Sequence, residues 1–267
     1  MKFQTHSRRW ASAIGAGCAL AMLTAPLAQS ALVGQLGILD LTANGGINPA
    51  TNEAWKYGDT YRLVFITSTS VNSADSAMDS ITAWNAAVQS IANAANNSGT
   101  TGPDLSTVTW NIVGSSADVD ARDNTSTNPN VNSGYGIFAM NGSTVIANNF
   151  DMLWDSVVRD ERPEWTENGD HMSGVSEAVP WSFTGTSGNG TADGSLYLKD
   201  TSGGGNIRQG RNQDDHHWIN ASITGANWSD SGALSVYGMS ETLTVIPEPS
   251  TALLIGLGGL ALLRRRR

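Results

Sequence analysis

The sequence predicts an α+β fold, a single domain rich in short antiparallel strands with one long amphipathic helix. Only 15% of the 267 residues are charged and 29 are glycine, which favours short elements joined by turns over long solvated helices. One segment alone has a sustained helical period, whereas several short runs of β-branched and aromatic residues have strand character. Neither an internal repeat nor a linker is visible, so one domain is expected.

The first clear element is an apolar run, Tyr61 to Thr67, which predicts a mostly buried strand. A helix is expected next, because seven apolar residues recur at steps of three and four and share one face: Ala77, Met78, Ile81, Trp84, Val88, Ile91 and Ala95. Ser73 is its expected N-cap, and the segment from Asn96 to Gly99 its end. We expect Trp84 to be a core residue.

Shorter strands are expected further along the chain. Val108 to Val113 is one, and Asn141-Gly142 predicts a type I′ hairpin turn between the runs 135–140 and 143–147. Three more are expected in the glycine-rich second half: 181–183, 195–198 and 234–245. Strands therefore outnumber helices in the predicted fold.

The charge is unevenly distributed. The chain has 15 basic and 24 acidic residues and a net charge of −9, but seven basic residues lie within the first ten and the last four positions. Residues 31–246 retain 8 basic and 23 acidic residues, a net charge of −15. Such an acidic body repels phosphate backbones, so no nucleic-acid partner is expected.

The N-terminus has the pattern of a secretory signal peptide over residues 1–30. A basic start precedes an uncharged apolar run, Ala11 to Leu27, and small residues then favour cleavage between Ser30 and Ala31. A retained membrane anchor is the alternative. The one cysteine, Cys18, lies inside the apolar run, so cleavage would leave a mature chain without disulfides, thiol catalysis or cysteine-bound zinc.

The C-terminus, residues 247–267, has three consecutive features. Pro247, Glu248, Pro249 and Ser250 disfavour regular structure and leave an extended, accessible segment. An apolar stretch from Thr251 to Leu263 follows and predicts a hydrophobic helix. The chain then ends in Arg264, Arg265, Arg266 and Arg267, a cluster typical of the cytoplasmic side of a membrane.

This order of a Pro-Glu-Pro motif, an apolar helix and an arginine cluster resembles the PEP-CTERM sorting signal. The resemblance implies transient insertion in the inner membrane and recognition by an exosortase. It also implies removal of the tail, and delivery to the cell surface or extracellular polysaccharide matrix of a diderm bacterium. An unprocessed C-terminal membrane anchor is the alternative. Both place residues 31–246 outside the cytoplasm.

Part of the body resembles C-type-lectin-like and endostatin-like domains. The segments that carry this resemblance are Trp110 to Ser116, Asp120 to Asn124, and Asn227 to Asp230 before a closing strand. The resemblance implies a fold and no sugar-binding residues, because the family's disulfides and its carboxylate–proline–amide calcium loop are missing from this sequence.

Three aspartates, Asp118, Asp120 and Asp123, lie within six residues beside Asn124. Oxygen-rich clusters of this kind suit Ca²⁺, although the spacing is not that of an EF-hand. Capping aspartates in a solvated turn are the plainer interpretation. Calcium is therefore a weak hypothesis, and no other cofactor is predicted.

Trp165 and Trp228 lie among polar residues, and with Asp230 they are candidate contacts for a sugar ring. No zinc-protease, nucleophile-elbow or phosphate-loop motif occurs in the sequence. We therefore expect a non-enzymatic structural, adhesive or glycan-binding module, with extracellular polysaccharide as a partner. The alternative is a secreted glycan-active hydrolase that uses a pair of acidic residues.

Overall fold

The strand predicted from the apolar run lies at the centre of the main sheet. In the computed structural model, which describes residues 31–73, 75, 77–95, 103–156, 161–172, 181–194, 196–198, 207–211, 218–220 and 232–248, this strand is β4 (Thr60–Ile66). Two antiparallel strands, β12 (Tyr237–Ser240) and β13 (Leu243–Pro247), follow one edge of β4 in succession. The parallel strand β7 (Ile137–Ala139) occupies its other edge. Residues Leu32–Pro247 form one compact unit.

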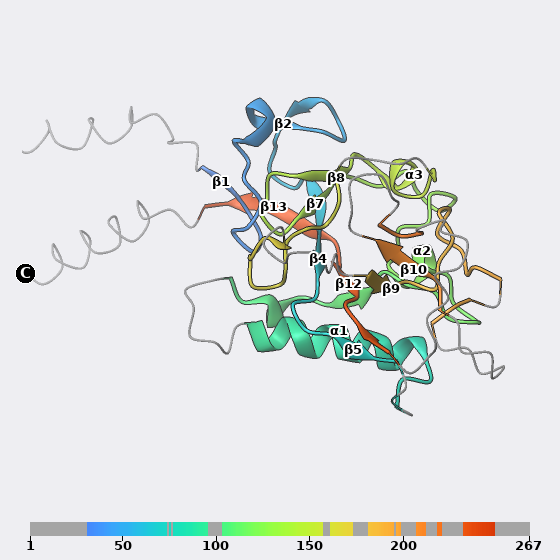
Figure 1. Cartoon of the computed structure of the whole chain (residues 1–267). Coiled ribbons are helices and arrows are strands. Elements are labelled where there is room, and N and C mark those ends of the chain that lie inside the picture. Colours follow the sequence, from blue (N-terminus) through green and yellow to red (C-terminus); the bar gives the residue numbers. More distant parts are fainter. Residues whose placement is uncertain are drawn as a thin grey trace, which may run out of the picture. The chain divides into compact units, whose positions relative to one another are not determined.

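The sheet is extended by three short strands. β1 (Leu32–Gly34) pairs with β13, β6 (Trp110–Ile112) with β12, and β8 (Val145–Ala147) with β7, all antiparallel. Outside this sheet, the described residues form the helices α1 (Ile81–Ala95), α2 (Ala121–Asn124) and α3 (Phe150–Leu153) and the 3-10 turns Ala43–Gly46 and Leu105–Thr107. They also form two-stranded ribbons: β2 (Ile47–Asn48) with β3 (Glu53–Ala54), β5 (Val71–Asn72) with β11 (Ala233–Leu234), and β9 (Trp181–Phe183) with β10 (Gln209–Arg211). Figure 1 shows these elements around β4. The prediction of many short antiparallel strands with few helices is confirmed.

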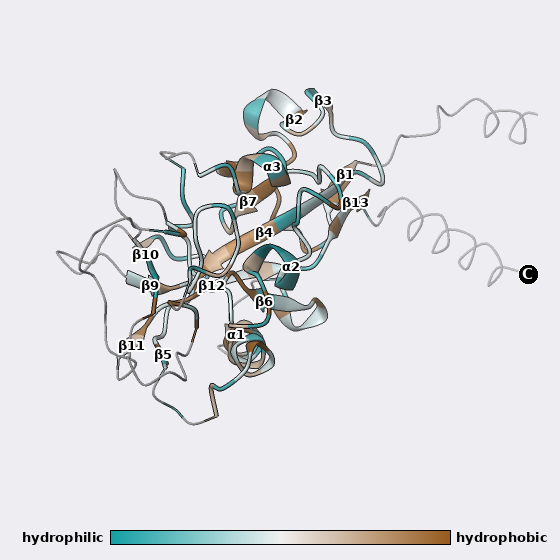
Figure 2. Ribbon diagram, turned by 90° about the vertical axis from the view of Figure 1, so that its right-hand side faces the viewer, coloured by the Kyte–Doolittle hydropathy of each residue, from teal (hydrophilic) through white to brown (hydrophobic). Residues whose placement is uncertain are grey.

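Both faces of the central sheet are buried. Alternate side chains of β4 enter different clusters: Leu63 and Phe65 pack on one side, and Val64 and Ile66 on the other. α1 covers the first face, and α2 and α3 contribute to the second. Beyond the buried Arg62, β4 is therefore hydrophobic, and Figure 2 shows it brown over that part and teal over another. Burial on both faces explains why residues 63–66 are a continuous apolar run and not an alternating one.

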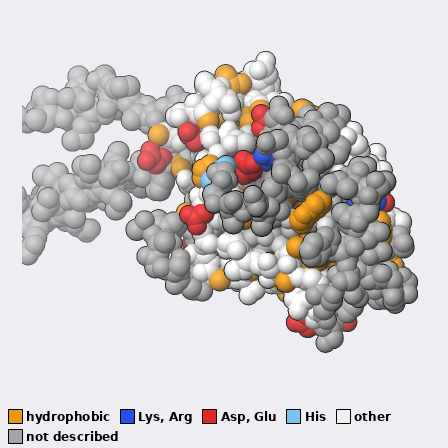
Figure 3. Space-filling view, viewed as in Figure 1, with side chains coloured by type: hydrophobic (Ala, Val, Ile, Leu, Met, Phe, Trp, Pro, Cys, Tyr) orange, Lys and Arg blue, Asp and Glu red, His pale blue; other side chains and the backbone are white. Residues whose placement is uncertain are grey.

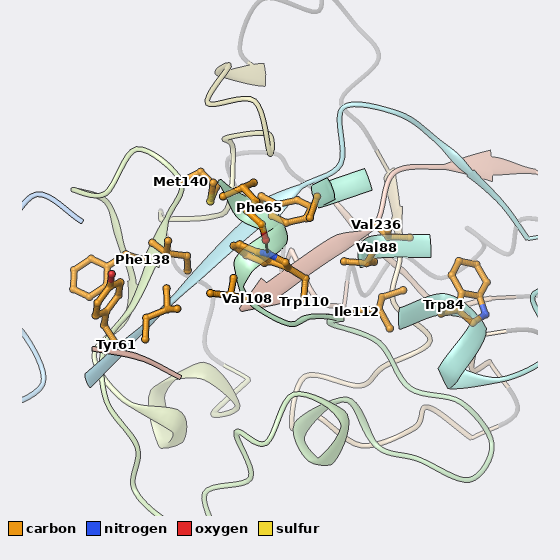
Figure 4. Packing of buried hydrophobic residues seen from close by; sticks show 14 of the residues in the cluster. Tyr61, Phe65, Trp84, Val88, Val108, Trp110, Ile112, Phe138, Met140 and Val236 are labelled. Atoms are coloured by element: carbon orange, nitrogen blue, oxygen red, sulfur yellow. Dashed lines mark hydrogen bonds between the residues drawn. The ribbon is translucent and has the colours of Figure 1, made fainter. Parts of the chain in front are cut away.

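Aromatic rings fill the space between α1 and the sheet. The rings of Phe65 and Trp110 lie 4.9 Å apart between centroids, and the indole N–H of Trp110 donates to the Leu105 carbonyl over 2.9 Å. Trp84, on the buried face of α1, belongs to the same cluster, shown in Figure 4. A Cβ atom on Gly238 would lie 2.5 Å from the Phe65 ring and 2.7 Å from Val88, so glycine there permits close approach of helix and sheet.

The sequence predicted one strand over 234–245, and the structure divides it. β11, β12 and β13 are separate strands, and Glu241 and Thr242 lie between the last two. A buried guanidinium lies at this break, because Arg62 donates to the Ser240 carbonyl over 2.5 Å. The Arg62 guanidinium lies 5.9 Å and 5.8 Å from the ring centres of Tyr135 and Phe150. Burial lowers the pKa of Arg62.

Three finer predictions are corrected by long-range or local hydrogen bonds. α1 begins at Ile81 and not near Ala77; the Ser80 hydroxyl accepts from the Ala83 amide over 3.3 Å, while the predicted cap, Ser73, donates to the Gly232 carbonyl. The hairpin β7–β8 is present, but its turn is not type I′. Asn141 has no positive φ, and its side-chain oxygen accepts from the Thr144 amide over 3.0 Å. Leu196 to Leu198 form no strand, because the Leu196 amide donates locally to the Asp193 carbonyl over 2.8 Å.

Candidate functional site

The end of β13 lies beside the start of β1. The register places Leu32 opposite Pro247, Val33 opposite Ile246 and Gly34 opposite Val245. The ladder extends one step further, because the Glu248 amide donates to the Ala31 carbonyl over 2.6 Å. The predicted sorting motif therefore begins inside a paired strand.

Hydrogen bonds fix which backbone groups face β1. The Gln35 amide donates to the Thr244 carbonyl over 3.0 Å, and Glu248 pairs with Ala31. The N–H and C=O groups of the even-numbered residues in 244–248 therefore face β1. Odd-numbered residues face the opposite edge, as the Val245 amide does when it donates to the Asp59 carbonyl over 2.8 Å. Pro247, which has no N–H, also faces that edge. Proline at this position costs no hydrogen bond with β1.

The pairing of β13 becomes one-sided toward its end. Its contact with β4 covers Leu243 and Thr244, and the turn before β4 reaches only Val245, whose carbonyl accepts from the Gly58 amide over 2.9 Å. For the residues after Val245, β1 is the one strand partner within the described part of the chain. Pro247 and Glu248 are exposed.

The remaining residues of the predicted terminal signals lie outside the described residues. These are Ser30 of the predicted cleavage site, Pro249 and Ser250 of the motif, the apolar stretch, and Arg264, Arg265, Arg266 and Arg267. Ala31 is described and pairs with Glu248 as above. None of the helices in the described part of the chain has the length and apolar character needed to cross a membrane.

Trp165 lies in a small hairpin that docks on the edge of β4. The Ile66 amide donates to the Trp165 carbonyl over 3.1 Å, and Trp165 pairs with His171 across the hairpin, where their rings lie 4.8 Å apart, edge to face. The indole is half-buried and packs against both hydrophobic clusters. Its contacts are those of a ring that covers the core.

A chain of charged side chains lies on the same hairpin. Arg162 contacts one carboxylate oxygen of Glu164 at 2.7 Å, and His171 Nε2 lies 3.0 Å from the other. Figure 3 shows a histidine beside basic and acidic side chains on this face. Glu167, although buried, accepts a hydrogen bond from the Ser68 amide over 2.9 Å and one from the Ser68 hydroxyl. Glu164 therefore holds the hairpin together, and Glu167 joins it to the segment that follows β4.

The three aspartates of the calcium hypothesis lie around α2, and two of them are engaged with other groups. Asp120 precedes the helix and accepts from the Ala192 amide over 2.8 Å, with Arg122 at 3.5 Å from its other oxygen. Asp123 accepts from the Asn128 side chain over 2.6 Å. Asp118 lies in the preceding turn. Within the described residues, no group of three or more His, Cys, Asp or Glu side chains is arranged to hold a metal ion.

Sequence reasoning did not identify the pairing of Ala31–Val33 with the sorting motif. A three-residue strand has no periodic signal, and its partner is more than 200 positions away. The one local indication was the two-residue spacing of Pro247 and Pro249, which suits a strand with both prolines on one edge. The other predicted contacts, Trp228 and Asp230, lie outside the described residues.

Comparison with known proteins bears on the C-terminus. A search of curated proteins finds no match to this chain. The family model of the PEP-CTERM protein-sorting motif matches residues 245–267, which include the end of β13. The resemblance to lectin-like domains receives no support from the family comparison. The chain carries a PEP-CTERM sorting motif and is thus an exported protein that is anchored in the membrane before an exosortase processes it.

Proposed function

We propose that the body of this protein is a non-enzymatic structural module of the cell surface or the extracellular polysaccharide matrix. The observation that carries the proposal is the direct connection between body and sorting motif. Pro247 is both the last residue of β13 and the first residue of Pro-Glu-Pro. The folded body is therefore joined to the sorting motif with no residues between them.

The internal partners of three described carboxylates support a structural role. Glu164 is engaged with Arg162 and His171, Glu167 with Ser68, and Asp120 with the Ala192 amide and Arg122. A carboxylate pair for glycoside hydrolysis needs one group to donate a proton and the other to reach the substrate or its water. Carboxylates that are occupied by internal partners favour a scaffold over that chemistry.

Adhesion to polysaccharide is the finer part of the proposal. Trp165 covers the core with a half-buried ring, and Trp228 and Asp230 are the other predicted sugar contacts. An exposed aromatic face beside hydrogen-bonding groups is the arrangement that such stacking needs. A net charge of −15 over residues 31–246 favours neutral or cationic glycans, or acidic glycans bridged by cations.

Delivery is tested in a diderm host that carries an exosortase, by antibody detection of the full chain. We expect the mature chain, without its tail, in the surface or matrix fraction. Replacement of Arg264, Arg265, Arg266 and Arg267 by serine is expected to reduce this delivery, because the positive cluster fixes membrane orientation. Unchanged mass and unchanged distribution of the variant would contradict the proposal.

Activity and binding are tested with mature chain purified from that fraction. We expect no release of reducing ends from the host's exopolysaccharide, and retention on the immobilised polysaccharide that falls in Trp228→Ala but persists in the matched Trp165→Phe variant. Release of reducing ends that is lost on substitution of one carboxylate would establish the hydrolase alternative. Equal retention of wild type and Trp228→Ala would exclude that tryptophan as the contact.

A further inference from the structure

The strand β1 covers one edge of the sorting motif. Ala31 and Val33 face Glu248 and Ile246 as hydrogen-bonded pairs, by the alternation established above. An enzyme that cuts or transfers a peptide bond binds the segment around that bond as an extended chain. With β1 in place, one edge of that segment is already paired and is closed to the enzyme.

The opposite edge of the motif is open to the enzyme but closed to other strands. The nitrogen of Pro247 faces that edge and carries no hydrogen, so a passing strand finds no donor there. Glu248, between the two prolines, directs its N–H to Ala31. The alternation of Pro-Glu-Pro thus permits pairing with β1 and discourages pairing with another chain.

The covering ladder is short and weakly buried at its end. Leu32, Val33 and Ile246 are half-buried, and Pro247 and Glu248 are exposed, whereas every residue of β4 after Thr60 is buried. Segments with few buried contacts open locally without unfolding of the rest of the domain. The pair can therefore separate at a low population while the body stays folded.

We propose that β1 shields the sorting motif, and that exosortase acts on the minor population in which Ala31–Val33 has separated from Ile246–Glu248. This inference concerns the regulation of the sorting step. Predicted signal-peptide cleavage between Ser30 and Ala31 makes the shield the new N-terminus of the protein. The opening of this N-terminal strand then sets the rate at which the tail is removed.

The test compares two proline substitutions in β1 of the full chain. Val33→Pro removes an N–H that faces β13, whereas the matched control, Leu32→Pro, removes one that faces away. Tail removal in the exosortase-containing host is followed by pulse-chase and intact mass. Val33→Pro is expected to be processed about fivefold faster, which is the effect of one backbone hydrogen bond on local opening. Leu32→Pro is expected to match the wild type.

A second measurement separates the shield from the sorting enzyme and from the proposed structural function. Hydrogen exchange of single backbone amides is measured in the detergent-solubilised full chain. We expect Val33→Pro to accelerate exchange of the Glu248 amide about fivefold and to leave exchange of the amide of the exposed Glu53 unchanged. Equal exchange rates of the Glu248 amide in both variants would overturn the shield, as would slower tail removal in Val33→Pro. Accelerated exchange of the Glu53 amide as well would mean general unfolding and would also overturn it.

Discussion

The central strand β4 and the terminal pair β1–β13 use the same backbone ladder under different conditions. β4 has partners on both edges, and both faces of its strand are packed against apolar clusters. The end of β13 has one partner and exposed residues at Pro247 and Glu248. Hydrogen bonding is common to both, so side-chain burial determines which ladder stabilises the fold and which can open.

Phe65→Ala should have the largest effect, because it empties the middle of the α1 side of the core. Its ring contacts Trp110 and lies next to Gly238. We expect a loss of about 3–5 kcal/mol in the free energy of unfolding, measured by denaturant titration. A loss below about 1 kcal/mol would show that β4 is not packed as described.

Gly238→Ala tests the close approach of α1 to the sheet. The added methyl would overlap the Phe65 ring and Val88, and we expect a loss of about 1–3 kcal/mol. The double variant Phe65→Leu/Gly238→Ala should lose less than the sum of the two single variants, since the smaller side chain leaves room for the methyl. Strict additivity in thermal or denaturant unfolding would argue against this contact.

Alkaline pH offers a milder way to weaken the core. Burial raises the pKa of Tyr61 to about 12, against an ordinary value of about 10. The buried, neutral Tyr61 hydroxyl stabilises the fold fully below pH 10. This stabilisation is lost as the pH rises toward 12, because the unfolded chain releases the hydroxyl proton first. Burial raises the pKa of Tyr237 as well, so both tyrosines contribute to the loss.

Tyr61→Phe should therefore lose less stability between pH 9 and pH 11.5 than the wild type does, as followed by denaturant titration at each pH. Tyr57→Phe is the matched control, since that ring is 72% exposed. Identical pH profiles for the wild type and Tyr61→Phe would mean that this hydroxyl is not buried in the folded chain.

Val33→Pro should have the smallest effect on global stability. It removes one hydrogen bond at the weakly buried end of the sheet, so we expect a loss of about 1 kcal/mol or less in the free energy of unfolding. In calorimetry, the main unfolding transition of the variant should lie close to the temperature of the wild-type transition. A loss as large as that of Phe65→Ala would place β1 in the cooperative core.

The same contrast explains how much of the structure the sequence predicted. The run 61–67 and the helical stripe with Trp84 have local signals, and both became elements of the core. The hairpin at Asn141 was predicted, but its turn type was not, because the Asn141 side chain bonds to the turn amides. Local pattern identifies an element, while its detailed geometry depends on competing hydrogen bonds.

The rest depended on distant partners that no local pattern shows. Ser73 is not the N-cap of α1, because its hydroxyl donates to the Gly232 carbonyl, 159 positions away. At the break between β12 and β13, the Ser240 carbonyl accepts from Arg62, which lies 178 positions away. At the candidate site, the sorting motif was recognised from its residues, whereas its pairing with β1 appears in the folded structure alone.

Native-state hydrogen exchange tests the central contrast most directly, because it measures the opening of each ladder in one sample of the folded chain. We expect the Ile246 and Glu248 amides to exchange through a local opening of low free energy that is insensitive to denaturant. The Val64 and Phe65 amides should exchange through global unfolding, with a strong dependence on denaturant. Exchange of all four amides with one free energy and one denaturant dependence would contradict the account, because β1–β13 would then open only with the core.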